Sequence, residues 1–284
     1  MSDHLADPIA AALAEDVGAG DLTSHYFVLP GAQALGRIVA RERAIVAGAE
    51  TAAEVFRRVD PKLHLEVTQP DGSTLMGGET ILEIRGAARS ILTAERVALN
   101  FLQRLSGIAT VTRQFVEGAG KSRAKILDTR KTTPGLRALE KAAVIAGGGA
   151  NHRFGLYDMV LVKDNHLMAG AGFAAVSAAI QRVREERPDV RIEVEADRLE
   201  QVRAFLEMGG IDVILLDNMA PAEMREAVAL GRKKGVKFEA SGGVTLKNIR
   251  QIAATGVDYI SVGALTHSAP AVDLSLELTH VAAG

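Results

Sequence analysis

The sequence predicts an α/β protein built in two parts, an α+β domain over residues 1–105 and an α/β barrel over residues 106–269. Three observations support this prediction. After residue 120, short apolar runs alternate with amphipathic stretches, which is typical of repeated βα units in a parallel sheet. Each of these apolar runs ends in polar residues or glycine. Before residue 105, strands and helices are predicted without that regular alternation.

The overall composition is that of a globular protein. A length of 284 residues allows one large domain or two ordinary ones, and 48% of the residues are hydrophobic and 24% charged. A formal net charge of −2 argues against a general nucleic-acid-binding protein, so no nucleic-acid partner is expected. The absence of cysteine excludes disulfides, a cysteine nucleophile, iron–sulfur clusters and thiolate zinc sites.

The sequence also predicts where the protein works. Its apolar runs stay below the roughly 18 residues needed to span a membrane. The acidic N-terminal stretch lacks the basic region of a signal peptide. We therefore expect a cytoplasmic protein without a membrane partner.

The first part is predicted to contain both helices and strands. Asp7 is suited to the N-cap and Pro8 to the first position of a helix over residues 7–16, and a glycine-containing turn follows it. Alternation of apolar and polar residues predicts strands within residues 34–46. The later elements are one helix and two strands, over residues 48–59, 63–68 and 80–85.

A long amphipathic helix is predicted over residues 89–116, because apolar residues recur there with helical spacing. Arg96 stands among those apolar positions, with Glu95 beside it. On this pattern alone, Arg96 is a solvated side chain or one half of an ion pair. Residues 1–105 show no catalytic motif of their own.

The second part alternates predicted strands with predicted helices. The strands cover residues 125–128, 159–163, 190–195, 212–217, 236–240 and 257–262. The helices between them cover residues 135–146, 173–187, 197–208, 221–234 and 245–255. The final segment, residues 272–278, alternates like an edge strand, so residues 270–284 are expected to rejoin the first domain.

The polar strand ends favour a barrel over a doubly wound sheet. In a barrel, groups that follow parallel strands converge on one mouth, whereas a doubly wound sheet spreads them along a crevice. Here all six strands end in such groups, and these are Asp128, Arg130, Lys131, Lys163, Asp164, Asn165, Glu195, Asp217, Asn218, Ser241, Gly242, Gly243 and Gly263.

Cationic side chains gather in the window of residues 125–166. As a set at strand ends and adjoining loops, they predict a pocket for a small polyanion, since arginine matches carboxylates and lysine acts as a compact charge for phosphate. Taken singly, each is better explained as a surface residue. The set consists of Arg130, Lys131, His152, Arg153 and Lys163.

Glycines after the last two strands predict a phosphate site. Ser241, Gly242 and Gly243 precede a predicted helix, so their backbone N–H groups and the helix N-terminus can receive an anion. Gly263 follows the last strand in the same way. A plain turn is the alternative for either site alone, but two consecutive sites resemble the phosphate site of α/β barrels.

Glu195 and Asp217 end neighbouring strands and supply hard oxygen ligands. Such carboxylates suit Mg²⁺ held together with substrate phosphates. Structural ion pairs with lysine are the alternative. Glu193 lies two residues deeper in its strand and is the weaker candidate.

Long motifs of this chain resemble one known family, the quinolinate phosphoribosyltransferases. They occur in the same order over nearly the whole chain. The motifs are EDVGAGDLT (15–23), ERVALNFLQRLSGIAT (95–110), TRKTTPGLR (129–137), NHRFGLYD (151–158), LVKDNH (161–166), EVE (193–195), LLDN (215–218) and SGGV (241–244).

The resemblance implies an N-terminal α/β sandwich followed by an open, TIM-like α/β barrel of about six strands. It implies a Mg²⁺-dependent reaction of quinolinate with phosphoribosyl pyrophosphate that gives nicotinate mononucleotide, pyrophosphate and CO₂ in NAD biosynthesis. It also implies a homodimer or higher homo-oligomer in which Arg96 reaches the partner's site, contrary to the interpretation from pattern alone.

The resemblance further implies roles for individual residues. Arg130, His152 and Arg153 would hold the quinolinate carboxylates, and Lys131, Thr132 and Lys163 would contact the substrates. Glu195 and Asp217 would hold Mg²⁺ and the ribose, and with Lys131 and Lys163 they form the catalytic set. The 5′-phosphate would lie on Ser241, Gly242, Gly243 and Gly263.

Three other functions are compatible with parts of the sequence. A barrel aldolase would use Lys163 as a Schiff-base nucleophile, but it leaves Arg130 and Arg153 unexplained. A sensor of phosphate ligands would bind without turnover. A paralogue would act on another aromatic acid. The acidic pair followed by Thr-Gly-Gly-Thr is absent, which argues against the common nucleobase phosphoribosyltransferase fold.

Overall fold

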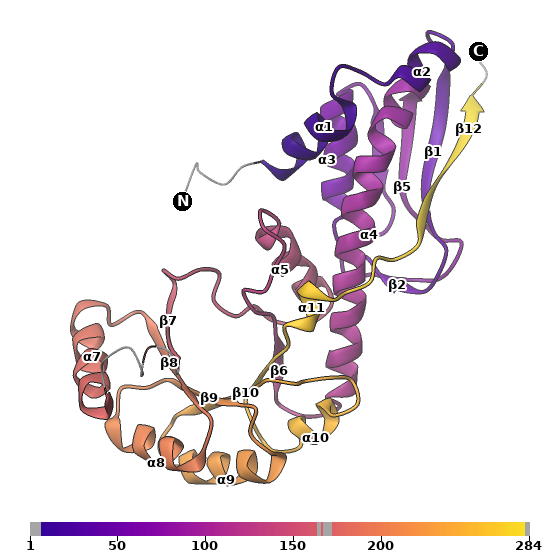
Figure 1. Cartoon of the computed structure of the whole chain (residues 1–284). Coiled ribbons are helices and arrows are strands. Elements are labelled where there is room, and N and C mark those ends of the chain that lie inside the picture. The colour runs from indigo at the N-terminus through magenta and orange to yellow at the C-terminus, as the bar shows by residue number, and fades with distance from the viewer. Residues whose placement is uncertain (1–6, 164–165, 167–171, 282–284) are drawn as a thin grey trace. The chain divides into compact units, whose positions relative to one another are not determined.

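The structure of the chain, a computed structural model, describes residues 7–163, 166 and 172–281 (Figure 1). The chain divides into two compact units. The first comprises residues 1–113, 132–148 and 265–284, and the second comprises residues 114–131 and 149–264. None of the described helices has the length and apolarity that crossing a membrane requires.

These units differ from the predicted domain limits at residues 105 and 269, chiefly because residues 132–148 join the first unit. A buried ion pair explains the difference. Arg104 donates from Nη2 to Oε1 of Glu140 at 3.0 Å, and Glu140 is fully buried. The same carboxylate accepts hydrogen bonds from the backbone N–H and the hydroxyl of Thr133. Hydrophobic patterning along the chain does not reveal a pair so far apart in sequence.

An antiparallel sheet with the order β12-β1-β5-β3 organises the first unit. Its strands are β12 (Leu274–Val281), β1 (Gln33–Ala40), β5 (Thr80–Ala87) and β3 (His64–Val67). The C-terminal strand thus pairs at the edge with the first strand of the chain. Gly107 permits the returning segment to pass close by, because a Cβ there would lie 2.0 Å from the carbonyl oxygen of Pro270.

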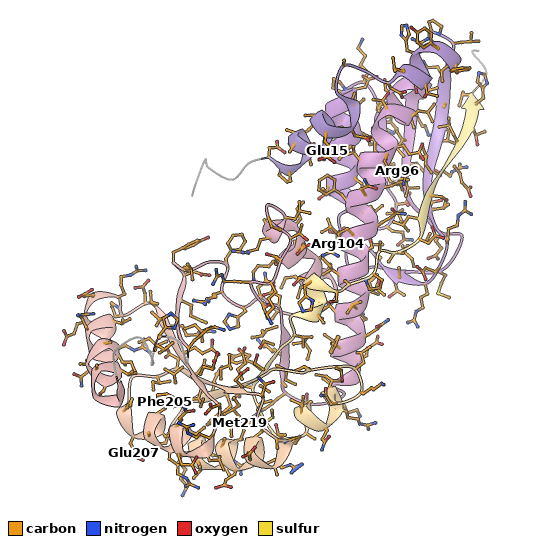
Figure 2. The ribbon with its side chains drawn as sticks, viewed as in Figure 1. Glu15, Arg96, Arg104, Phe205, Glu207 and Met219 are labelled. Carbon is orange, nitrogen blue, oxygen red and sulfur yellow. The ribbon has the colours of Figure 1, made fainter. Side chains whose placement is uncertain are left out.

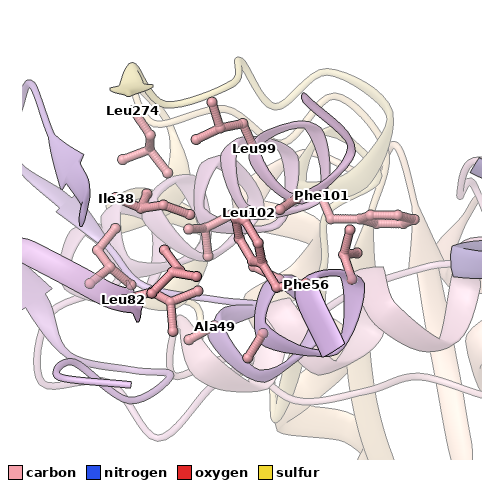
Figure 3. Packing of buried hydrophobic residues seen from close by; sticks show 14 of the residues in the cluster. Ile38, Ala49, Phe56, Leu82, Leu99, Phe101, Leu102 and Leu274 are labelled. Atoms are coloured by element: carbon pink, nitrogen blue, oxygen red, sulfur yellow. The ribbon is translucent and has the colours of Figure 1, made fainter. Parts of the chain in front are cut away.

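The longer helices of this unit contribute to one hydrophobic core with the sheet. They are α1 (Pro8–Val17), α3 (Ala49–Val59), α4 (Ala88–Gly118) and α5 (Arg137–Ala146). Asp7 caps α1 as predicted, by accepting from the N–H groups of Ile9 and Ala10. Buried side chains from the strands, α3 and α4 form one cluster, which includes Ile38, Phe56, Leu82, Leu99 and Leu102 (Figure 3).

A parallel six-stranded sheet forms the second unit and confirms the predicted open α/β barrel. In sheet order its strands are β6 (Lys125–Leu127), β11 (Tyr259–Ser261), β10 (Lys237–Ser241), β9 (Val213–Asp217), β8 (Arg191–Ala196) and β7 (Met159–Val162). Helices lie on the outer face of this curved sheet (Figure 1), and they are α7 (Gly172–Glu186), α8 (Leu199–Met208), α9 (Pro221–Gly231) and α10 (Ile249–Ala253). Among the described strands, β6 and β7 are the two edges, so the barrel is open.

Several short elements are absent from the sequence prediction. They are α2 (Leu22–Phe27), α11 (Ala264–His267) and β4 (Thr74–Leu75), which pairs with β2 (Ala44–Ile45) inside the predicted strand region 34–46. Helix α2 exposes most of its large apolar side chains, so it lacks the buried stripe that identifies a helix from sequence. Elements of two to four residues are too short for any periodic signal.

Candidate active site

The carboxyl ends of neighbouring strands bring the predicted acidic and glycine-containing groups together. Asp217 at the end of β9 lies in register with Ser241 at the end of β10. On the other side of β9, Glu195 near the end of β8 lies in register with Leu215. Because side chains alternate along a strand, these polar groups share the inner face of the sheet. The predicted polar strand ends Asp164 and Asn165 lie outside the described residues.

Glu195 forms an ion pair with one of the predicted lysines. Nζ of Lys163 lies 3.5 Å from Oε2 of Glu195. The Lys163 side chain is 47% exposed and that of Glu195 is 14% exposed, so solvent screens the pair and either partner remains within reach of a ligand. Glu195 therefore has a lysine partner in this structure and is still accessible to a ligand.

Asp217 is held by the residue that follows it. Its Oδ2 accepts from Nδ2 of Asn218 at 2.9 Å, and the backbone of Asn218 is left-handed with φ of 53°. The Asn218 N–H donates to the carbonyl oxygen of Ser241 at 2.9 Å. Two half-buried carboxylates on adjacent strands are the donor set that suits Mg²⁺ with substrate phosphates, so Glu195 and Asp217 fit that ion.

The glycine turn after β10 has a shape that side chains would obstruct. Gly242 and Gly243 have φ of 88° and 59°. A Cβ at Gly242 would lie 2.1 Å from Oδ1 of Asn218. Glycine is therefore required at position 242 by its positive φ and by the Asn218 side chain that lies against it.

The predicted helix after this turn is shorter than expected. Helix α10 begins at Ile249 and ends at Ala253, because Asn248 closes a turn in which its Oδ1 accepts from the N–H of Thr245. Helix α11, after Gly263, has only four residues. Any anion here would therefore depend on the backbone N–H groups of the glycines rather than on a long helix dipole.

Replacing Gly242 with alanine is expected to weaken binding of a phosphate-bearing substrate, raising its KM by about tenfold or more, because the turn must open to relieve the overlap with Asn218. Steady-state kinetics measure this effect. Gly235→Ala is the matched control, since Gly235 also has positive φ but has no atom near its missing Cβ. An equal rise in both variants would contradict the role of this turn.

A network of hydrogen bonds fixes the loop that carries His152 and Arg153. The N–H of Ala150 donates to the carbonyl oxygen of Ile126 at 2.8 Å, which ties the loop to β6. Buried Asp128 accepts from the backbone N–H of His152 at 2.9 Å. The N–H of Arg153 donates to Nδ1 of the His152 ring at 2.7 Å. Asp128, predicted only as a polar strand end, is therefore a structural support of this loop.

Arg153 and Arg130 lie close enough to repel one another. Burial lowers the pKa of Arg153, and the positive charge of Arg130 lowers it further. Two cations in one place raise the free energy of the empty site, and a bound anion relieves that repulsion. This arrangement agrees with the prediction of a pocket for a small polyanion.

A buried acidic cluster lies behind His152. Nε2 of His152 is 3.0 Å from Oε2 of Glu193 and 3.6 Å from Oε2 of Glu239, and the two glutamates are 1% and 2% exposed. Sequence analysis missed Glu239 and ranked Glu193 low. The sequence does contain a signal for both residues. Glu193 and Glu239 each lie within a predicted strand between apolar neighbours, and a charged side chain buried at such a position needs a partner.

Burial beside a second carboxyl changes the protonation of Glu239. Burial and the charge of Glu193 raise the pKa of Glu239 to about 8. Burial alone lowers the pKa of His152, but its hydrogen bond to Glu193 and the charges of both glutamates outweigh burial and raise it. The Arg153 N–H donates to Nδ1, so the hydrogen bonding in the structure is that of the neutral ring.

This cluster predicts how stability depends on pH. Between pH 4.5 and 8, folded Glu239 keeps a proton that the unfolded chain releases. The free energy of unfolding therefore decreases as the pH rises through this window, by about 1.4 kcal/mol per pH unit for one proton. Glu239→Gln removes this dependence, because glutamine does not titrate. The Tm of the variant minus the Tm of the wild type should therefore be larger at pH 8 than at pH 5.5.

Thermal unfolding followed by circular dichroism at both pH values measures this difference. Glu207→Gln is the control, because Glu207 is an exposed residue of α8. A Tm difference between the Glu239 variant and the wild type that is the same at both pH values would show that Glu239 does not hold the proton.

Two predicted site residues, Arg96 and Thr132, belong to the first unit. Arg96 is exposed, and it lies on α4, where Figure 2 labels it together with Arg104. Burial raises the pKa of its neighbour Glu95. Thr132 accepts from Nε of Arg137 at 3.0 Å. The remaining predicted site residues all lie in the second unit.

The fold and this site define a class of protein, an α/β-barrel enzyme whose strand ends are suited to anionic substrates. Comparison with known proteins specifies the class further. Residues 21–106 match the N-terminal domain of quinolinate phosphoribosyl transferase, and residues 108–277 match its C-terminal domain. The chain belongs to the quinolinate phosphoribosyltransferase family.

Curated relatives and solved structures agree with this assignment. A probable nicotinate-nucleotide pyrophosphorylase [carboxylating] of Bacillus subtilis is 45% identical over 93% of this chain and 90% of its own length. The nicotinate-nucleotide pyrophosphorylase [carboxylating] of Mycobacterium leprae is 44% identical over 97% of this chain and 98% of its own. The structure of the Francisella tularensis nicotinate-nucleotide pyrophosphorylase aligns with a TM-score of 0.88 at 37% identity, over 95% and 94% of the two chains.

Proposed function

We propose that this protein transfers the phosphoribosyl group of phosphoribosyl pyrophosphate to quinolinate and releases CO₂, giving nicotinate mononucleotide and pyrophosphate in NAD biosynthesis. Membership of the family supports this function. The observation in the structure that carries it is the mutually repelling pair Arg130 and Arg153, in the same unit as the carboxylates Glu195 and Asp217. The two arginines suit a substrate with two carboxylates. The two carboxylates suit a ribose that becomes positively charged during the reaction.

Quinolinate would be held through its two carboxylates. Arg130 and Arg153 offer planar guanidinium groups that match carboxylates bidentately. His152 would complete this region, and Lys131, Thr132 and Lys163 would contact the anionic groups of the two substrates. The fixed loop of residues 150–153 supports such binding, because an immobilised arginine loses little entropy when it binds.

Phosphoribosyl pyrophosphate would lie along the ends of β8 to β11. Its 5′-phosphate would contact the glycine turn of Ser241, Gly242 and Gly243, together with Gly263. Glu195 and Asp217 would contact the ribose and hold Mg²⁺. When bound, Mg²⁺ would neutralise the negative charge of the pyrophosphate group.

The first chemical step forms one bond and breaks another. The ring nitrogen of quinolinate attacks C1′ of the ribose, and the bond from C1′ to the pyrophosphate oxygen breaks, with its electron pair leaving on the pyrophosphate. Positive charge accumulates on the ribose in the transition state. The carboxylates of Glu195 and Asp217 can stabilise that charge, and Lys131 and Lys163 can stabilise the departing anion.

The second step uses the substrate as its own electron sink. The ribosylated ring nitrogen is cationic, so the bond from C2 to its carboxylate can break with the electron pair left on C2. A proton then adds to C2, and CO₂ leaves. This route has no need of a pyridoxal or thiamine cofactor.

Product analysis tests the proposed function. The protein is incubated with phosphoribosyl pyrophosphate and Mg²⁺ and with quinolinate, nicotinate or nicotinamide in separate reactions. We expect nicotinate mononucleotide and CO₂ from quinolinate alone. Product from another aromatic acid only would indicate a paralogue of different specificity, and binding without any product would indicate a sensor.

We further propose a homodimer or higher homo-oligomer in which Arg96 reaches the site of the partner subunit. The exposed apolar side chains of α2 and the residues after it support self-association, because exposed apolar patches mark interfaces. They are Leu22, Tyr26, Phe27 and Leu29. The near-neutral charge supports an enzyme that acts on small molecules in the cytoplasm, without nucleic acid or membrane.

Complementation tests the role of Arg96. Arg96→Ala and Asp217→Asn should each inactivate the protein when alone. If Arg96 acts in the partner's site, a mixed dimer contains one intact site, so subunit exchange in an equal mixture should restore roughly a quarter of the sites. Activity assays before and after exchange measure this. A mixture that stays inactive would place Arg96 in the site of its own subunit, and an Arg96→Ala protein that is active alone would place Arg96 outside any site.

A further inference from the structure

We propose that Glu239 is a positioning residue that acts, together with Glu193, by holding the His152 ring in the one tautomer that fixes the backbone of Arg153. The cluster is buried behind the candidate site, and none of the roles described above requires Glu239. The consequence for catalysis rests on the proposed function, whereas the state of the ring does not.

The hydrogen bonds of the His152 ring define its tautomer. Nδ1 accepts from the N–H of Arg153 at 2.7 Å, so this nitrogen carries no hydrogen. A neutral imidazole then carries its hydrogen on Nε2. That nitrogen lies 3.0 Å from Oε2 of Glu193, and this oxygen accepts its hydrogen. His152 is therefore a neutral bridge between Glu193 and the backbone of Arg153.

Glu239 lowers the electrostatic cost of the hydrogen bond between His152 and Glu193. It is almost fully buried, its Oε2 lies 3.6 Å from Nε2 of His152, and burial beside Glu193 raises its pKa to about 8. Two adjacent buried carboxylates would repel one another if both were ionised, so a proton on Glu239 removes that repulsion beside the Glu193 oxygen that faces His152. Oε1 of each glutamate is buried with no hydrogen-bond partner among the described residues, which also disfavours two ionised groups.

The His152 ring adds the last of the hydrogen bonds that hold the backbone around Arg153. Hydrogen bonds from Ala150 and His152 already tie the preceding backbone to β6 and Asp128. The ring of His152 adds the bond to the N–H of Arg153 itself. In the other tautomer, a hydrogen on Nδ1 would point at the backbone N–H of Arg153. The two donors would then repel one another and displace Arg153, which lies near Arg130.

The same three side chains could in principle hold a metal ion, since their ligand atoms lie within 4.8 Å of one another. The tautomer of His152 argues against a metal site. A ring nitrogen binds a metal through its lone pair, but Nε2 carries the hydrogen here, and a ligating histidine normally donates from its other nitrogen rather than accepting. The positioning role is therefore the inference that the hydrogen bonds support.

Nitrogen NMR of protein with ¹⁵N-labelled histidine tests the state of the ring directly. His152 is assigned by the signal that disappears in His152→Asn. We expect one protonated ring nitrogen, Nε2, and an unprotonated Nδ1 at neutral pH. A protonated Nδ1, or one equivalent of tightly bound metal found by elemental analysis of the purified protein, would overturn the proposal.

Two pairs of variants test the consequence for Arg153. Asparagine can replace the Nδ1 acceptor of His152, whereas glutamine reaches only toward the position of Nε2. We expect the quinolinate KM of His152→Gln to exceed that of His152→Asn by about tenfold or more, since only the first variant leaves the Arg153 N–H unpaired. Similarly, Glu239→Met should raise this KM by about tenfold relative to Glu239→Gln, whose amide can still donate to Glu193.

The KM for phosphoribosyl pyrophosphate is the internal control, and it should differ by less than roughly twofold within each pair. A general loss of structure would move both KM values together and would overturn the specific role. Equal quinolinate KM values within the pairs would also overturn it. Absence of any product in the wild type would instead refute the proposed function, and the NMR result would still decide the state of His152.

Discussion

Replacing Arg153 with methionine is expected to lower kcat/KM for quinolinate by about 100-fold, because a hydrogen bond between charged groups contributes about 1.5–3 kcal/mol. Methionine keeps the length of the side chain but removes its charge and donors. The variant should be at least as stable as the wild type, since the repulsion between Arg153 and Arg130 disappears. We therefore expect kcat/KM for quinolinate to fall in Arg153→Met while the Tm does not.

Steady-state kinetics and thermal unfolding of the same samples measure the two effects. Arg203→Met is the matched control, because Arg203 pairs with Glu226 on the outer helices and both side chains are about half exposed. We expect that control to retain its kcat/KM. Unchanged quinolinate kinetics in Arg153→Met would show that Arg153 does not bind this substrate.

Asp217→Asn is expected to lower kcat by about 10²–10³-fold, since it removes a negative charge from the place where the ribose becomes positive. Asparagine has nearly the same shape, and its oxygen can still accept from Nδ2 of Asn218. The fold of the strand end should therefore survive. If Asp217 also holds Mg²⁺, the concentration of Mg²⁺ needed for half-maximal activity should rise.

Measurement of kcat over a range of Mg²⁺ concentrations separates these contributions. Asp189→Asn serves as the control, because Asp189 is exposed just before β8, at the opposite end of that strand from Glu195. A kcat for Asp217→Asn close to that of the wild type at saturating Mg²⁺ would exclude electrostatic stabilisation by this carboxylate.

The site shows where prediction from sequence succeeds and where it stops. The positions of Glu195, Asp217 and the glycine turn at strand ends were predictable because each follows a predicted strand, and parallel strands bring their carboxyl ends to one edge. Glu239 was missed because its neighbours in the strand are apolar and its partners come from β8 and the loop before β7. A single strand does not reveal which acidic residues will meet in a barrel interior.

The sequence by itself determined the fold class, the positions of nearly all the longer helices and strands, and the family. These features depend on periodic burial and on the residues at strand ends, and both are local properties of the chain. Long motifs such as those at residues 129–137 and 151–158 are local in the same sense.

Only the tertiary structure decided how distant residues pair. It joined residues 132–148 to the first unit through Arg104 and Glu140, and it gathered His152, Glu193 and Glu239 into one buried cluster. The physical reason is common to both cases. A buried charge requires a partner, and which residue supplies that partner depends on the packing of segments that are far apart in sequence.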